Sequence, residues 1–298
     1  MPTVSPSEYA DRYRNLEVGF ADGNVTVTIE RYHTGNPDAE SGMLVQAAKE
    51  FFQTQIKKDP NFKFELIINK ESVETTYDEV KAHIAAPFWG KGSPEDCQIA
   101  AQLAVLTHRT TKDNLRKYCD EHLGLDCNGL VGNYFFHVRN PNGQSWKSTA
   151  SAADLGPTSM MSQFARAGQP VRDIDAINPA NIHLFLEVDA ALNVIPGGSA
   201  KPGHIVITEP NVYSPYPFIA IAFGGGDARY TQKGAFGHPA LWAVESTGPQ
   251  GAIGLKESWY AIKQSVATQN QKNRGIYEVF RECKLSNLNF ELVAFPPM

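Results

Sequence analysis

Cys127 lies in a sequence context that favours a reactive thiol. Asp126 stands directly before it, and Asn-Gly-Leu-Val follows at residues 128–131, with apolar positions of helical spacing continuing to Val138. This pattern predicts a helix that begins at Cys127, where unpaired N–H groups and the helix dipole lower the pKa of a thiol. Such a cysteine could act as a nucleophile, although a buried structural cysteine fits the local sequence equally well.

His204 is the first candidate for a base that would act with this thiol. A Pro-Gly turn at residues 202–203 delivers the histidine to the start of the apolar run Ile-Val-Ile-Thr, which predicts a strand. Rigid backbone at a sheet edge would hold the imidazole where it could take a proton. A partly exposed turn histidine is the plainer interpretation. His238 is a rival base, but the proline after it suits a loop better than a strand start.

Glu245 is the candidate for a residue that orients the imidazole. It ends the apolar segment Ala-Leu-Trp-Ala-Val-Glu at residues 240–245. If this strand pairs antiparallel with the strand after His204, its end lies beside the start of that strand. Glu245 could then accept the imidazole N–H, as the third member of a catalytic triad does. An exposed glutamate at a strand end is the alternative, and Gln250 in the following glycine-rich loop is a second candidate for this position.

The remaining motifs predict neither a metal site nor a cofactor site. No Cys-x-x-Cys pair occurs, which argues against a zinc or thioredoxin-like site, and four cysteines in 298 residues are too few for a disulfide scaffold; besides Cys127 they are Cys97, Cys119 and Cys283. The glycine-rich segments at residues 224–226 and 248–255 lack the Lys-Ser/Thr and the βα context of phosphate-binding loops. We therefore expect chemistry that needs no cofactor and no metal.

The composition excludes several classes of protein. The net charge is −5, and no cluster of lysine and arginine suggests a nucleic-acid partner. No apolar run approaches the roughly 18 residues of a membrane span. The first residues carry neither a basic nor an apolar leader region, so we expect cytoplasmic synthesis, with export by a dedicated secretion system as one route.

The order of the expected elements predicts an α+β fold. Helical spacing marks residues 41–57, 94–107, 111–122 and 127–138, and strand patterns mark residues 24–30, 62–68, 182–188, 204–208, 217–223, 240–245 and 275–281. The later strands are short and separated by glycine and proline, as in an antiparallel sheet with long connections. We expect an N-terminal α+β extension of unknown role over residues 1–110 and a second domain over residues 111–298.

Three of these segments, taken in order, resemble a known family. Asp-Cys-Asn-Gly-Leu-Val at residues 126–131, Gly-His-Ile at 203–205 and Val-Glu-Ser at 244–246 with a glycine-rich exit look like the motifs of NlpC-type, papain-related cysteine peptidases and amidases. The resemblance covers about residues 112–281. The layout is also similar to amidase effectors that bacterial secretion systems deliver, which lack signal peptides.

This resemblance implies a papain-like fold with the cysteine at a helix N-terminus packed on an antiparallel sheet. It implies hydrolysis of amide bonds in bacterial cell-wall peptides, with Cys127 as nucleophile, His204 as base and Glu245 as the orienting residue. The backbone N–H of Cys127 would give one oxyanion donor, and Tyr118 is a candidate for a second. The chain departs from the family in its long spacing of 77 residues between Cys127 and His204, and the family varies at the third position.

Two other functions remain open from the sequence. A papain-like chain can lose activity and act as a binding or interaction protein, because fold alone does not determine function. The same Cys–His pair could also serve an acyltransferase or a transglutaminase-like enzyme. For the hydrolase, the expected partners are a peptide or muropeptide substrate and, for a secreted effector, an immunity or inhibitor protein. We expect no nucleic-acid partner and no membrane association.

Overall fold

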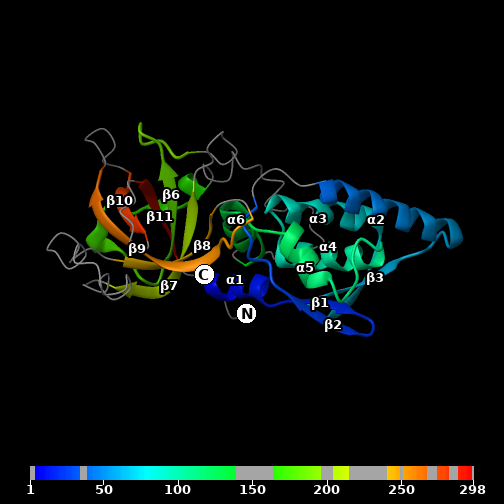
Figure 1. Ribbon diagram of the computed structural model, residues 1–298. Helices are drawn as coiled ribbons and strands as arrows, with labels where there is room; N and C mark the ends of the chain where they lie inside the picture. The colour runs from blue at the N-terminus through cyan, green and yellow to red at the C-terminus, as the bar shows by residue number, and fades with distance from the viewer. Residues whose placement is uncertain are drawn as a thin grey trace. The chain divides into compact units, whose positions relative to one another are not determined.

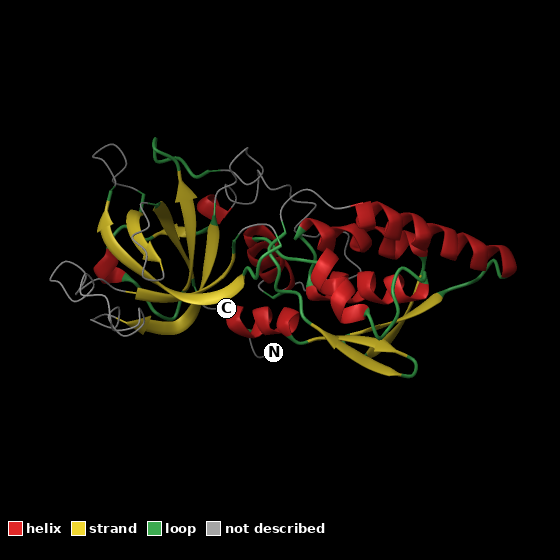
Figure 2. Cartoon of the chain, in the orientation of Figure 1, coloured by secondary structure: helices red, strands yellow, loops and turns green. Residues whose placement is uncertain are grey.

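The computed structural model describes residues 4–33, 39–138, 164–195, 204–214, 240–248, 251–266, 274–281 and 288–296. It confirms the α+β class, with helices concentrated in the first half of the chain and strands in the second (Figures 1 and 2). None of the helices in these ranges combines the length and the apolar character needed to cross a membrane.

The chain divides into two compact units, and each is described by itself. The first, which we call the helical unit, comprises Glu8–Leu155 and Ser246–Leu255. The second, the barrel unit, comprises Met1–Ser7, Gly156–Glu245 and Lys256–Met298. The boundary that we expected near residue 110 therefore lies inside the helical unit, and the helix that begins at Cys127 belongs with the N-terminal segment.

The helical unit contains six α-helices, one 3-10 helix and two β-hairpins among the residues described. In chain order these are α1 Pro6–Arg14, β1 Leu16–Phe20, β2 Gly23–Val27, α2 Ala39–Lys58, β3 Phe64–Ile68, β4 Glu71–Thr75, α3 Tyr77–Ala85, η1 Ala86–Trp89, α4 Pro94–Leu106, α5 Leu115–His122 and α6 Cys127–His137. The predicted helices at 41–57 and 94–107 correspond to α2 and α4. The helix predicted from residue 111 begins later, at Leu115, because a turn precedes it.

Helix α4 is the central helix of this unit, and its start follows from the sequence. Ser93 Oγ accepts the N–H of Asp96 at 3.1 Å, and the Asp96 carboxylate accepts the N–H of Ser93 at 2.8 Å, which forms a capping box. Pro94 occupies the first helical position, where its missing N–H costs nothing. Every residue from Pro94 to Ala104 is buried, as expected of a helix packed on all sides.

The barrel unit is built on six strands that close on themselves. They are β6 Ile182–Val188, β7 Ile205–Ser214, β8 Ala240–Ser246, β9 Leu255–Ser265, β10 Ile276–Arg281 and β11 Asn289–Phe295. Neighbours hydrogen-bond in this order, and β11 pairs with both β10 and β6, which closes the ring. The short β5 Gln169–Pro170 pairs with Val293 and Ala294 of β11, beyond the residues of β11 that pair with β10, and the 3-10 helix η2 Ile174–Ala176 follows it. The predicted strands 182–188, 204–208, 240–245 and 275–281 are confirmed within about one residue at their starts, whereas residues 217–223 lie outside the described ranges.

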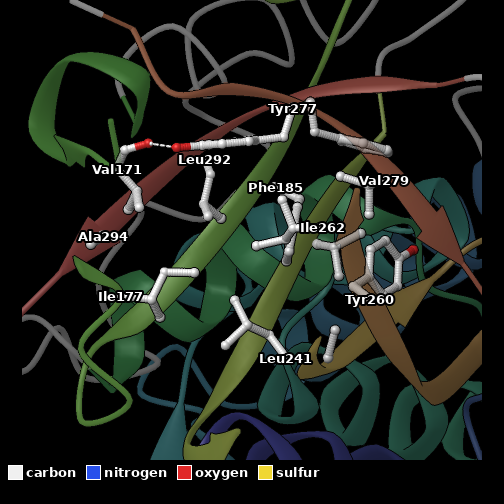
Figure 3. Packing of buried hydrophobic residues seen from close by; sticks show 13 residues of the cluster. Val171, Ile177, Phe185, Leu241, Tyr260, Ile262, Tyr277, Val279, Leu292 and Ala294 are labelled. Carbon is white, nitrogen blue, oxygen red and sulfur yellow. Dashed lines mark hydrogen bonds between the residues drawn. The ribbon is translucent and has the colours of Figure 1, made fainter. Parts of the chain in front are cut away.

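Alternate residues of the six strands fill the interior with apolar side chains. The rings of Phe185, Tyr260 and Phe290 lie 5.1 to 6.3 Å apart, a spacing at which aromatic pairs contribute about 0.5–1.5 kcal/mol each beyond area burial. Figure 3 shows this packing, with Phe185 and Tyr260 labelled among aliphatic residues of the neighbouring strands. The full cluster is Val171, Ile177, Phe185, Val206, Leu241, Ala243, Tyr260, Ile262, Tyr277, Val279, Phe290, Leu292 and Ala294.

His183 is a polar exception at one end of this interior. It lies two residues before Phe185 on β6, on the same face of the strand, and is 1% exposed. Burial disfavours the charged imidazolium and lowers the pKa of His183 to about 4. The ring is therefore neutral near pH 7.

We predict that this histidine makes the barrel sensitive to acid. Below about pH 6.5 the unfolded chain binds a proton that the folded chain does not, so stability is lost as the pH falls from about 6.5 to about 4. For His183 alone the full loss is on the order of 3 kcal/mol. Urea unfolding of the natural chain and of His183→Phe at several pH values measures it. The advantage of His183→Phe should grow toward low pH, and a difference that does not change with pH would contradict the prediction.

Candidate functional site

The backbone of His204 is held by the neighbouring strand. Its N–H donates to the Glu187 carboxylate at 2.7 Å, and its carbonyl accepts the N–H of Glu187 at 3.0 Å. Glu187 belongs to β6, and His204 directly precedes β7. The imidazole ring lies 6.5 Å from the ring of Phe290, measured between centroids. These contacts fix the position from which the imidazole extends.

Glu245 contacts this imidazole, as the antiparallel pairing predicts. The register pairs Ile207 on β7 with Val244 on β8, and His204 Nε2 lies 2.8 Å from Glu245 Oε2. Glu245 follows Leu241 and Ala243 on the inward face of β8 and is fully buried. A buried carboxylate is costly unless it is hydrogen-bonded, so its partners are part of the site.

Two further side chains donate hydrogen bonds to Glu245. The Tyr260 hydroxyl donates to Glu245 Oε2 at 2.8 Å, and the Ser258 hydroxyl donates to Oε1 at 3.2 Å. The Tyr260 hydroxyl also lies 3.4 Å from His204 Nε2. Ser258, Tyr260 and the imidazole thus offer the carboxylate three hydrogen-bond donors, which offset its loss of hydration. Tyr260 and Ser258 both lie on β9, a strand that the sequence pattern does not predict.

This arrangement determines what the imidazole can do. Because Glu245 is placed to accept the Nε2 proton of His204, it selects the tautomer that carries hydrogen on Nε2 and stabilises the imidazolium when it forms. Proton exchange with a thiol or a substrate then falls to Nδ1 of the same ring. His204 and Glu245 therefore have the geometry of a general base with its orienting acid.

Cys127 is the first residue of α6 in the helical unit, which confirms the predicted helix start. Asp126 is the N-cap residue, and its Oδ1 accepts the N–H of Gly129 at 2.6 Å. Cys127 forms no disulfide, and the residue is buried, with 4% of its surface exposed. Cys127 and His204 belong to different compact units. Each candidate thus stands at the predicted kind of position, a helix start and a strand start.

Lys91 and Asp126 form a buried ion pair that fixes the chain before Cys127. Burial raises the pKa of the Asp126 carboxyl, and the Lys91 ammonium opposes that rise. The backbone closes the same region, because the N–H of Asp126 donates to the Gly90 carbonyl at 3.0 Å, and Asn133 Nδ2 donates to the Lys91 carbonyl at 2.9 Å. The start of α6 is therefore tied to residues 90–91 by side-chain and backbone contacts.

Other candidates from the sequence lie elsewhere or outside the described residues. The Tyr118 hydroxyl donates to Glu40 at 3.0 Å, and Glu40 also binds Arg109, so this hydroxyl serves a different network and gains no support as an oxyanion donor. Burial raises the pKa of Cys97 well above its usual value and that of Cys119 to about 12. The residues Gln250, His238 and Cys283 lie outside the described ranges.

Neither a metal centre nor a relative identifies the chain. Within the described ranges, no group of three or more His, Cys, Asp or Glu side chains is placed to hold a metal ion. Protein-family models, curated proteins and solved structures were compared with the chain, and none matches it. The case for function therefore depends on the residues themselves.

Gly129 gives a direct test of the packing behind Cys127. A methyl group at this position would lie 1.9 Å from the Gly90 carbonyl oxygen, which belongs to the backbone and cannot turn away. We predict that Gly129→Ala lowers the unfolding free energy by about 1–3 kcal/mol or more. Gly42→Ala is the matched control, because Gly42 also lies in a helix, with open space around it, and should gain up to about 1 kcal/mol. Denaturant unfolding of both variants should give opposite signs, and equal changes would contradict the packing argument.

Proposed function

We propose that this protein is a cysteine amidase or peptidase that uses Cys127 as nucleophile, His204 as general base and Glu245 as the residue that orients His204. The observation that carries the proposal is the hydrogen bond between His204 Nε2 and the buried Glu245 carboxylate. A histidine oriented in this way can act as a general base toward a nucleophile. Cys127 supplies one of the right kind, because it begins a helix directly after its N-cap residue.

The proposed reaction proceeds in two steps. Cys127 Sγ bonds to the carbonyl carbon of the amide while its proton passes to His204 Nδ1, and the C–N bond then breaks as the same proton passes to the leaving amine. A water molecule next attacks the thioester, gives its proton to His204 and releases the acid, and the thiol is restored. The backbone N–H of Cys127 is the proposed donor to the oxyanion.

The proposed fold and substrate come from the sequence resemblance. We propose a papain-like fold on this resemblance, and the α+β class and the antiparallel pairing of β7 and β8 are compatible with it. The proposed substrates are amide bonds of bacterial cell-wall peptides, and the proposed place of action is the cell wall, reached by a dedicated export system. The observation that favours the alternative, a binding protein without activity, is the burial of Cys127.

Removal of the Cys127 thiol tests the proposed nucleophile directly. Cys127→Ala should abolish the hydrolysis of purified muropeptides, because no other described cysteine begins a helix. Cys119→Ala is the matched control, since Cys119 is also a buried cysteine that forms no disulfide, and it should keep most of the activity. Mass spectrometry of the released peptides measures both variants. Full activity in Cys127→Ala would overturn the proposed nucleophile.

Alkylation separates the enzyme from a binding protein on the same fold. Near neutral pH, iodoacetamide should label Cys127 much faster than Cys97 and Cys119, because burial raises the pKa of both of those thiols. Equally slow labelling of all three would favour the binding protein. Addition of an amine to the reaction, with analysis of the products, distinguishes hydrolysis from acyl transfer.

Substitution of Glu245 and of Tyr260 tests how His204 is oriented. Glu245→Gln should lower kcat by about 10²–10⁴-fold with little change in KM, because it weakens the orientation of a general base rather than substrate binding. Tyr260→Phe removes one donor from Glu245 and should lower kcat by roughly tenfold, in line with a lost hydrogen bond to a charged group.

Tyr277→Phe is the matched control for this loss. The Tyr277 hydroxyl is also buried in the barrel, but it donates to the Val171 carbonyl at 2.7 Å and not to the His204–Glu245 pair. Steady-state kinetics should therefore show an unchanged kcat for Tyr277→Phe. A fall in kcat that is equal in Tyr260→Phe and Tyr277→Phe would assign both effects to barrel stability and contradict a positioning role for Tyr260.

A further inference from the structure

A cavity of about 470 Å³ lies at one end of the barrel interior. Its walls come from the segment before β6 and from the ends of β6 and β11; the residues are Gln169, Pro170, Val171, Arg172, Asp173, Ala176, Ile177, Asn178, Asn181, His183 and Ala294. All of them belong to the barrel unit. In Figure 3, Val171, Ile177 and Ala294 lie on the side of the core cluster away from Tyr260. The cavity is thus separate from the His204–Glu245 pair, and its volume falls within the usual range of small-molecule sites.

The cavity wall is fixed by hydrogen bonds before any ligand arrives. The N–H of Val171 donates to the Leu292 carbonyl at 2.9 Å, and the Tyr277 hydroxyl donates to the Val171 carbonyl at 2.7 Å (Figure 3). A methyl group on Gly275 would lie 1.8 Å from the same carbonyl oxygen, so the backbones of residues 171 and 275 are in close contact. A wall of this kind loses little conformational entropy when a ligand binds.

His183 lies at the inner end of this cavity with unsatisfied hydrogen-bonding capacity. It is 1% exposed, and neither ring nitrogen makes a hydrogen bond of normal geometry with the residues that the structure describes, although an interaction with the backbone of Asn181 offsets part of the effect of burial on its pKa. Its backbone N–H donates to Thr208 Oγ1 at 2.8 Å, which anchors the main chain at this position. Buried polar atoms without partners are uncommon in native proteins and require an explanation.

The lining groups select the chemistry of an occupant. A neutral imidazole offers one donor and one acceptor, and the amide side chains of Asn178, Asn181 and Gln169 offer both as well. Arg172 and Asp173 carry opposite charges, so the lining has no net charge with which to select an anion or a cation. The inner wall is apolar at Val171, Ile177 and Ala294 and accepts small aliphatic groups.

We propose that this cavity is a binding site for a small peptide-like molecule, in which an amide group pairs with the ring of His183 and an aliphatic side chain contacts Ile177 and Ala294. An amide has both a donor and an acceptor and no charge, which matches the lining better than a phosphate, a carboxylate or an ammonium group does. The site is independent of the proposed hydrolase activity, because it shares no residue with it.

The experiment titrates the full chain with N-acetyl-L-alanine methylamide and follows the ring signals of its histidines by NMR. The signal of His183 is identified by its absence in His183→Phe. We expect a saturable shift of this signal, with a dissociation constant on the order of millimolar for a ligand of this size. The absence of a saturable shift up to roughly ten times that concentration would overturn the proposal.

Two tryptophan substitutions test the location without touching the buried histidine. Ala176 is exposed and lines the cavity, so Ala176→Trp should fill its entrance and weaken binding by about tenfold or more. Ala180 lies in the following turn outside the lining, so Ala180→Trp should bind as the natural chain does. Equal affinity in the two variants would overturn the location. Methyl glucoside, a neutral ligand with hydroxyl groups and no amide, should bind more weakly, and equal or tighter binding would overturn the ligand class.

Discussion

The closure of the barrel imposes the constraint on which both polar sites depend. Because β11 pairs with β10 and with β6, the six strands leave no open edge, and every second side chain points into a shared interior. A side chain in that interior must be apolar, or it must find hydrogen-bond partners inside the barrel. Most inward positions are apolar. Glu245 satisfies the constraint with three donors, whereas neither ring nitrogen of His183 makes a hydrogen bond of normal geometry with a described residue.

The two polar positions lie at different places along the same strands. From His204 to Thr208 the chain advances four residues, or roughly 13 Å. The backbone N–H of His183 donates to Thr208 Oγ1, so His183 lies near the far end of this stretch. The aromatic rings of Phe185, Tyr260 and Phe290 pack together in the same interior. The barrel thus supports two polar groups of opposite kinds: a hydrogen-bonded charged pair and a neutral ring beside a cavity.

The sequence predicts the local parts of this structure and misses the parts that depend on distant contacts. The helix at Cys127 and the contact between His204 and Glu245 follow from patterns of a few residues and one antiparallel pairing. The alternation in β9, with Ser, Tyr and Ile at its inward positions, mixes polar and apolar types and gives no clear strand signal. The placement of α6 in the helical unit depends on long-range contacts, such as the hydrogen bond from Ser246 Oγ to the Leu125 carbonyl at 2.6 Å, which join segments 121 residues apart.

The energetic cost of the Glu245 cluster is itself an argument for function. Replacing a buried charged network with apolar side chains of similar volume is often neutral or stabilising, by about 1–4 kcal/mol in known cases, whereas removing a single partner is costly. A closed barrel with three packed aromatic rings does not need a buried carboxylate for its stability. Tyr260 and Ser258 both donate to Glu245, which contacts the imidazole of His204, and this is the arrangement that an oriented base requires. The position of this charge beside a histidine, rather than its contribution to stability, is what best explains its presence in the core.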